Sequence, residues 1–222
     1  MHSTEKNTLL ADSIRLAFGT YNVLNGAWLR SETGKVTGVL GRNGCGKSCM
    51  FRSIMGELKT QGLFVKFNDT VVTGSDEMGR YVKYMAQKTF LPPKMPLKQI
   101  FEYFGADYEA FTEDFPRFAM YPDTPVKELS GGEVRIVEIW LCLCSDAPFC
   151  ILDEPFSYLA PVAVEVIQKL IRRQKEKMGI IVSDHNYEAL LEIADEVLLL
   201  SDGYVHLIKD RSDLVRYGYC HF

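Results

Sequence analysis

The residues best suited to do chemistry lie in one glycine-rich run that ends in a lysine and a serine. The run consists of Gly41, Arg42, Asn43, Gly44, Cys45, Gly46, Lys47 and Ser48, in the pattern G-x-x-x-x-G-K-[ST] of a phosphate-binding loop. Glycines allow backbone angles that a Cβ would block, so successive N–H groups can turn toward one anion. Lys47 can then reach the β and γ phosphates of a nucleotide, and the Ser48 hydroxyl can bind Mg²⁺.

The elements on either side of this loop must position it. Residues 35–40 are predicted to form a buried strand, and residues 49–55 are predicted to form the helix that follows the loop. Such a helix presents its positive end to the phosphates. A chance glycine-rich turn would not be expected to have both neighbours, so we interpret the run as a nucleotide site.

A second motif lies in the middle of the chain, where a mostly apolar run over residues 134–143 begins. The motif consists of Leu129, Ser130, Gly131, Gly132 and Glu133. The serine and the two glycine N–H groups at a helix start can point at one spot, which predicts a second anion site.

With these motifs the chain resembles the ATP-binding cassette (ABC) ATPase family. The matching segments, in the family's order, are GRNGCGKS at 41–48, Gln87, LSGGE at 129–133, CILDEP at 150–155 and SDH at 183–185. The segments 130–139 and 183–200 most resemble the subfamily that includes the ATPases of lipopolysaccharide export and of branched-chain amino-acid import. The resemblance implies a P-loop NTPase that binds ATP with Mg²⁺.

The pattern of elements agrees with an α/β fold. Strands are predicted at 13–18, 23–29, 62–67, 70–73, 81–86, 149–152, 179–183, 197–200 and 204–208, and helices at 97–104, 107–115, 132–144, 161–177 and 186–194. Alternation of strands and helices indicates a parallel core sheet. The resemblance adds a RecA-like core with an antiparallel β edge over 1–88 and 148–222, and an inserted helical subdomain over 89–147, in a single domain.

Two acids follow the apolar strand at 149–152, where ligands of open α/β sheets bind. Asp153 is expected to hold the Mg²⁺ shell directly or through water, and Glu154 to orient or deprotonate the attacking water. The alternative is a pair of acids that caps a helix.

The resemblance assigns further roles. Gln87 is expected to bind Mg²⁺ with Ser48 and Asp153, and His185 to sense the γ phosphate beside Lys47 and Glu154. Phe18, with Tyr21 as the second candidate, is expected to stack on adenine; both could instead be core aromatics. The full set expected to bind nucleotide is Phe18, Gly41, Arg42, Asn43, Gly44, Cys45, Gly46, Lys47, Ser48, Cys49, Gln87, Ser130, Gly131, Gly132 and Glu133.

The resemblance also predicts partners. The LSGGE segment contacts ATP held by a second subunit, which implies a homodimer with two shared sites. Integral-membrane transporter subunits are expected to dock between Gln87 and the helical insertion, on an apolar surface to which Phe90, Leu91, Phe101, Tyr103 and Phe104 could contribute; about half of these could instead be core residues. One departure is Ala160, where the family usually has Asp, so communication between the two sites is expected to be weak.

The composition of the chain argues against several other classes of protein. The chain has 222 residues and a net charge of −4, which argues against a broad nucleic-acid footprint. No apolar run approaches a membrane span, and residues 1–8 lack a signal-peptide core, so we expect a cytoplasmic protein, peripheral on the membrane's cytoplasmic face. The six cysteines match no metal pattern and are expected to be reduced thiols.

Three functions compete at this point. The first is the ATP-hydrolysing subunit that powers an ABC transporter through separate membrane subunits. The second is a soluble ABC ATPase of the assembly or repair type, although the long coiled coil of repair types and the second cassette of translation types are missing. The third is a catalytically dead nucleotide-binding module, against which Lys47, Glu154 and His185 argue.

Overall fold

A six-stranded sheet runs through the centre of the protein, of which a computed structural model describes residues 6–219. Cys220 and most of the polar N-terminal stretch named above lie outside the described residues. The strand order is β10-β9-β3-β8-β7-β6. The strands are β3 (Val36–Leu40), β6 (Val82–Met85), β7 (Phe149–Asp153), β8 (Gly179–Ser183), β9 (Glu196–Ser201) and β10 (Tyr204–Ile208). Every residue of β3, β7 and β8 is buried, as expected for parallel strands covered on both faces.

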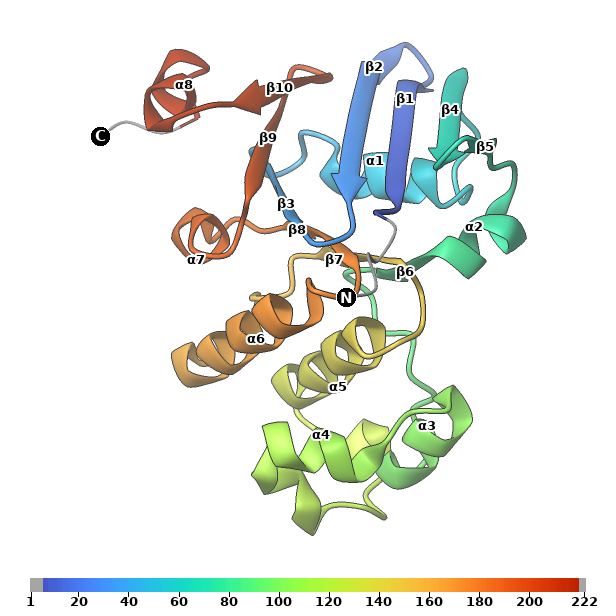
Figure 1. The fold of residues 1–222 in the computed structure, drawn as a ribbon, viewed down its shortest axis with the longest axis vertical. Helices are drawn as coiled ribbons and strands as arrows, with labels where there is room; N and C mark the ends of the chain where they lie inside the picture. Colours follow the sequence, from blue (N-terminus) through green and yellow to red (C-terminus); the bar gives the residue numbers. More distant parts are fainter. Residues whose placement is uncertain (1–5, 220–222) are drawn as a thin grey trace.

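A second sheet is antiparallel and has the order β2-β1-β4-β5. Its strands are β1 (Thr8–Phe18), β2 (Tyr21–Glu32), β4 (Gly62–Phe67) and β5 (Thr70–Val71). Helix α1 (Lys47–Ile54) lies beside this sheet in Figure 1. Its residues Met50, Phe51 and Ile54 belong to the apolar core that fills the space between the two sheets.

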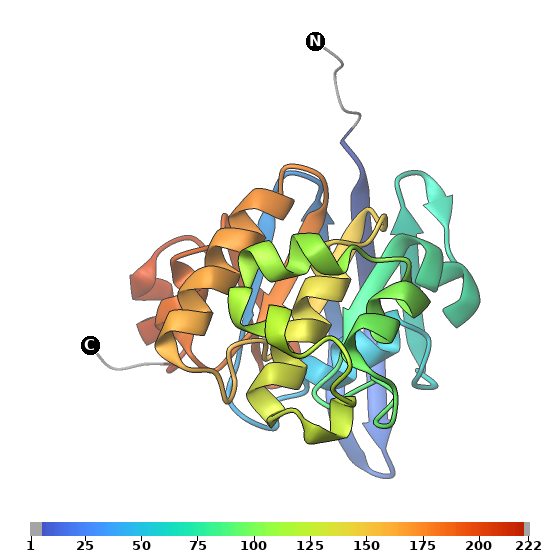
Figure 2. The ribbon, with the colours of Figure 1, turned by 90° about the horizontal axis from the view of Figure 1, so that it is seen from below.

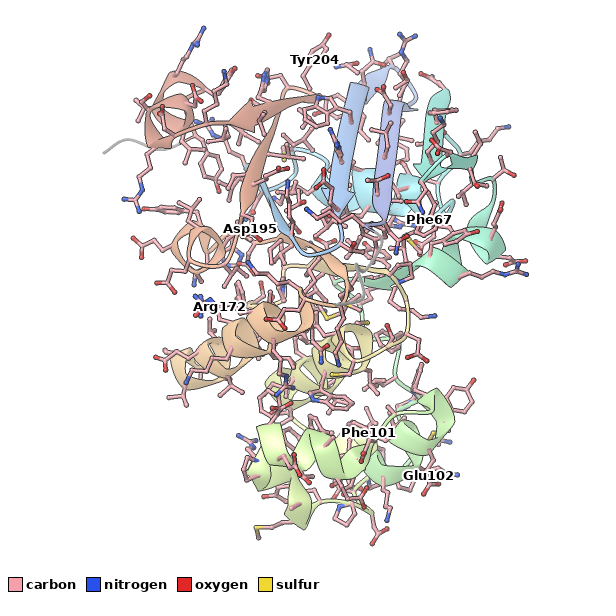
Figure 3. The ribbon with its side chains drawn as sticks, in the orientation of Figure 1. Phe67, Phe101, Glu102, Arg172, Asp195 and Tyr204 are labelled. Carbon is pink, nitrogen blue, oxygen red and sulfur yellow. The ribbon has the colours of Figure 1, made fainter. Side chains whose placement is uncertain are left out.

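The segment between β6 and β7 is helical. It contains α3 (Leu97–Phe104), α4 (Tyr108–Asp114), the 3₁₀ turns η1 (Pro116–Met120) and η2 (Val126–Glu128), and α5 (Gly131–Leu143). These helices lie together at one end of the molecule in Figure 1 and form a layer in front of the strands in Figure 2. An aromatic cluster holds them together, with Phe101, Phe111 and Phe118 fully buried; Figure 3 labels Phe101 within this helical group.

Helix α6 (Pro161–Gln174) packs beside α5, and two short helices, α7 (Tyr187–Leu191) and α8 (Arg211–Arg216), complete the fold. Within residues 6–219, no helix combines the length and the apolar character needed to cross a membrane.

The predicted elements differ from the observed ones mainly at their ends. The strand predicted over 81–86 begins at Val82, because residues 75–81 form a helix, α2 (Ser75–Tyr81), that the sequence did not reveal. The helix predicted over 186–194 is restricted to Tyr187–Leu191, and the one predicted over 161–177 ends at Gln174. Helix α8 was also not predicted.

Candidate functional site

The glycine-rich loop lies between the end of β3 and the start of α1, and two of its glycines are required by close packing. A Cβ on Gly46, whose φ is 110°, would lie 2.9 Å from Cγ1 of Val23. A Cβ on Gly41 would lie 2.5 Å from the sulfur of Cys45 and 2.7 Å from the carbonyl oxygen of Leu200. The backbone of the loop can therefore approach its neighbours only because these side chains are absent.

Lys47 is buried and folds back over this loop. Its ammonium group donates hydrogen bonds to the carbonyl oxygens of Gly41 at 2.8 Å and Arg42 at 3.4 Å. The first turn of α1 carries no acidic residue. The amide N–H groups at the start of α1 and the Lys47 charge therefore concentrate positive potential at one place, as an anion site requires.

The loop opens into a cavity of about 380 Å³ that also contains residues from two distant segments. The lining residues are Asn43, Gly44, Gly46, Lys47, Ser48, Cys49, Gln87 and Glu154. Gln87, which follows β6, donates a hydrogen bond from Nε2 to the hydroxyl of Ser48 at 3.2 Å. The fold thus brings together the loop, the glutamine and the carboxylate that the sequence singled out.

Asp153 occupies the last position of β7 and is fully buried. One carboxylate oxygen accepts a hydrogen bond from the Ser183 hydroxyl at 2.7 Å, and the other accepts one from the Tyr84 hydroxyl at 3.3 Å. Burial raises the pKa of Tyr84, and the neighbouring Asp153 carboxylate raises it further. Both partners were missed in the sequence; Ser183 lay in the SDH segment, whereas nothing distinguished Tyr84.

Glu154 has a left-handed backbone conformation, with φ of 55°. Its N–H donates to the Ser183 carbonyl oxygen at 2.8 Å, which ties the end of β7 to the end of β8. Its carbonyl oxygen accepts a hydrogen bond from Arg135 at 3.1 Å. The alternative that Asp153 and Glu154 are a helix-capping pair does not fit this arrangement, because Ala160 is the N-cap residue of the next helix.

Mg²⁺ fits the donor chemistry at one end of the cavity. The Ser48 hydroxyl oxygen and the Gln87 amide oxygen are hard donors, and the two side chains are adjacent, with Nε2 of Gln87 3.2 Å from the Ser48 hydroxyl. The Asp153 carboxylate already has two protein partners and lines no part of this cavity. No cluster of three or more His, Cys, Asp or Glu side chains suited to a metal is found in residues 6–219. A metal ion here would therefore share its shell with phosphate oxygens and water.

The LSGGE segment forms the start of α5 but does not line the cavity beside Lys47. Ser130 is the N-cap residue: its hydroxyl accepts a hydrogen bond from the N–H of Glu133 at 3.3 Å, and the Glu133 carboxylate accepts one from the N–H of Ser130 at 2.7 Å. Arg117 also pairs with Glu133. Within one chain, this segment and the glycine-rich loop remain separate.

His185 and the two candidate adenine partners lie outside the cavity that Lys47 lines. The His185 side chain is 57% exposed and lies 3.6 Å from a carboxylate oxygen of Asp184. Phe18 and Tyr21 face each other across the β1–β2 hairpin and are 55% and 68% exposed. The alternative that both aromatics belong to the core is therefore wrong.

A profile described as ABC transporter matches residues 24–157, which is more than half of the chain. The chain belongs to the ABC transporter family. This ABC protein is an ATPase whose ATP hydrolysis powers a transporter. ATP-binding subunits of the family work with membrane subunits and usually dimerise.

Two relatives illustrate the similarity in sequence. A probable ABC transporter ATP-binding protein of Azorhizobium caulinodans is 28% identical over 96% of this chain and 81% of the relative. The lipopolysaccharide export system ATP-binding protein LptB of Acidithiobacillus ferridurans is 29% identical over 89% of this chain and 88% of the relative.

Solved structures show the same fold. The structure of an ATP-binding subunit of an ABC transporter superposes with a TM-score of 0.80 and 21% identity, over 95% of this chain and 93% of that one. The α/β architecture described above is accordingly that of a P-loop NTPase of the ABC type.

The thiols of the phosphate loop and of the first turns of α1 have raised pKa values. Burial raises the pKa of Cys45, and it also raises the pKa of Cys49, where it outweighs the nearby Arg52 charge. A raised pKa keeps a thiol protonated and poorly nucleophilic. Cys45, Cys49, Cys142, Cys144 and Cys150 are all free thiols.

Proposed function

We propose that two copies of this chain bind two ATP molecules with Mg²⁺ between them and transmit the energy of hydrolysis to integral-membrane subunits. The observation that carries the proposal is the single cavity that contains Lys47, Ser48, Gln87 and Glu154. These side chains come from three segments of the chain, and positioning together with charge neutralisation is most of what phosphoryl transfer requires.

Each of these four side chains receives a role in the proposal. Lys47 and the N–H groups at the start of α1 bind the β and γ phosphates. Glu154 accepts the proton of the attacking water. Ser48 and Gln87 hold Mg²⁺, which supplies charge neutralisation when bound, and Asp153 acts on its shell through water because its carboxylate is buried.

The remaining predicted site residues are assigned to the assembled state. We place adenine on Phe18, whose ring is exposed next to Tyr21. Ser130, Gly131, Gly132 and Glu133 serve the ATP of the second subunit. Tyr158, which is 96% exposed and has φ of 65°, lies between Glu154 and the start of α6 and would be covered in such a dimer. His185 is assigned to the γ phosphate in the same closed state.

We further propose that the membrane subunit docks on a groove beside the helical insertion, residues 89–147, which acts as a subdomain separate from the core at 1–88 and 148–222. A cavity of about 540 Å³ lies there, and its lining residues include Arg80, Lys83, Phe90 and Phe104. The rings of Phe90 and Phe104 are partly exposed and meet edge to face, with centroids 5.7 Å apart. Two cations beside two aromatic rings complement an amphipathic helix that carries an acidic residue.

Only three of the five residues expected on the docking surface are exposed. Leu91 and Phe101 are buried in the core and cannot contact a partner, whereas Phe90, Tyr103 and Phe104 are exposed. A docking site of this kind would place the protein on the cytoplasmic face of the membrane.

Co-purification in mild detergent tests the assignment to a transporter. Polytopic membrane proteins identified with the wild-type chain should be lost with Phe104→Ala and Lys83→Glu. They should be retained with Tyr204→Ala, a control that removes an exposed aromatic ring from β10, far from the groove (Figure 3). An ATPase that is active alone and co-purifies with soluble proteins only would instead support the assembly or repair type.

A further inference from the structure

One arginine at the start of α5 connects the segments that carry Gln87 and Glu154. The Arg135 side chain is buried, with 8% of the residue exposed. Its guanidinium donates to the carbonyl oxygen of Ala86 at 2.6 Å, to that of Glu154 at 3.1 Å, and to that of Asp153. The hydrogen bonds of one side chain therefore hold the end of β6 and the end of β7.

The next turn of α5 also binds this region through Glu138. Glu138 is also buried, and its Oε1 accepts a hydrogen bond from the N–H of Phe90 at 2.8 Å. Gln87 thus lies in a short segment whose two ends, Ala86 and Phe90, are both bound by α5.

Glu154 needs such support. Its φ of 55° is unusual for a residue with a side chain, and a backbone of this kind costs on the order of 1–3 kcal/mol unless its surroundings hold it. The Ser183 carbonyl holds the N–H of Glu154, and Arg135 holds the carbonyl. The direction of the Glu154 side chain follows from this backbone conformation.

If Arg135 served only to neutralise the buried charge of Glu138, the two side chains would be expected to form a close ion pair. The nearest guanidinium nitrogen lies 3.8 Å from the Glu138 carboxylate, whereas the carbonyls of Ala86 and Glu154 lie at 2.6 and 3.1 Å. The five N–H groups of a guanidinium in a fixed fork suit this task, because they can reach several acceptors at once.

We infer that Arg135 is a positioning residue for hydrolysis, which fixes the backbone of Glu154 so that its carboxylate faces the cavity. The inference rests on the proposed role of Glu154 as proton acceptor. Arg135 itself is absent from the lining of the Lys47 cavity and acts through the backbone.

The test measures ATP affinity, steady-state hydrolysis and thermal unfolding of Arg135→Met, Arg135→Lys and Arg172→Met. Arg172 is the matched control, because its guanidinium also donates to a backbone carbonyl, that of Glu192 at 3.1 Å, but the residue is exposed and lies on the side of α6 toward α7 (Figure 3). Arg135→Met should lower kcat about 10- to 100-fold, since small misplacements of catalytic groups have costs of this size. ATP affinity should change less than about twofold, Arg135→Lys should retain part of the activity, and Arg172→Met should match the wild type.

A double-variant comparison separates positioning from general destabilisation. In a Glu154→Gln background, Arg135→Met should cause no further loss of labelled-phosphate release in single-turnover assays, because the group it positions is already gone. An equal loss in both backgrounds would overturn the inference, as would an unchanged kcat, or a loss of ATP affinity that parallels a lower unfolding temperature. Full activity of Glu154→Gln alone would instead overturn the proposed role of Glu154.

Discussion

Arg173 on α6 and Asp114 at the end of α4 form two parallel hydrogen bonds, of 2.9 and 2.7 Å, between guanidinium and carboxylate. The indole N–H of Trp140 on α5 donates to the same carboxylate at 2.9 Å. One acidic side chain thus joins three helices, and two of them lie in the inserted segment between β6 and β7. Paired bonds of this geometry restrict the angle between the groups that they connect.

This relationship predicts a pH-dependent stability. Burial alone would raise the pKa of Asp114, but the hydrogen bonds from Arg173 and Trp140 outweigh it and lower the pKa below its ordinary value. The stabilisation is therefore complete above the pKa of the unfolded chain and is lost as the pH falls through the lower pKa of the folded state. Asp114→Asn should reduce the free energy of unfolding by about 1 kcal/mol at pH 7, since Arg173 is partly exposed.

Urea denaturation between pH 7 and pH 3 measures this effect. The difference between wild type and Asp114→Asn should stay constant down to about pH 4 and shrink below it. Asp123→Asn, the same change on an exposed aspartate, serves as the control. A difference that grows toward low pH would show that the carboxylate charge is not the stabilising feature.

Lys47→Ala should abolish tight ATP binding. Removal of a charge-assisted contact to phosphate is expected to cost about 10- to 100-fold in affinity. Isothermal titration calorimetry measures it, with Lys59→Ala as an exposed lysine control. Unchanged affinity of Lys47→Ala would exclude Lys47 from phosphate binding.

Ser130→Arg should leave ATP binding to the monomer nearly intact and prevent closure of an ATP-bound dimer. The reason is that Ser130 lies outside the cavity of its own chain, while an arginine would add bulk where the partner's phosphate is expected. Ser130→Ala controls for the lost helix cap, which costs about 1 kcal/mol. A closed dimer of Ser130→Arg with ATP and Mg²⁺ in gel filtration would contradict the shared-site arrangement.

Ala160→Asp should stabilise the protein by about 1 kcal/mol. Ala160 is the N-cap residue of α6, with φ of −69° and ψ of 148°, and no side chain caps this helix start. Thermal unfolding measures the gain in stability, and Ala160→Asn, which caps the helix without adding a charge, should show most of it.

The wild-type chain alone should hydrolyse ATP with a Hill coefficient near ~1. The reason is that Ala160 lacks the hydrogen-bond acceptor that an acid at this position would offer to couple the two sites. A steep sigmoidal dependence of the hydrolysis rate on ATP concentration would contradict this prediction.

The sequence predicted those elements that have an uninterrupted apolar run or a clear turn motif. The apolar runs at β7 and β8, and the Ser-Asp-Gly turn before β10, leave few alternatives. Helix α2 was missed because it is short and contains Gly79, so that its periodicity is weak. The helix predicted over 186–194 was too long because Glu192 and Ile193 form a turn, in which the N–H of Glu192 still donates to the Glu188 carbonyl oxygen.

The same contrast applies to the site. Sequence motifs identified Lys47, Ser48 and Glu154, because a phosphate-binding loop and acidic residues directly after a parallel strand are typical of nucleotide sites. The contacts of Tyr84 with Asp153, and of Arg173 with Asp114, join residues far apart in the chain. Such pairs depend on side-chain direction in the folded state, which no local pattern encodes.

The rate of ATP hydrolysis by Glu154→Gln, measured with its oligomeric state in ATP, tests the central claim most directly. The amide keeps the shape of the side chain but cannot accept the proton, so hydrolysis should fall about 10²- to 10⁴-fold while ATP binding persists. The variant should accumulate as an ATP-bound dimer in gel filtration, and Glu176→Gln, an exposed control, should behave as the wild type. Wild-type turnover by Glu154→Gln would contradict the account.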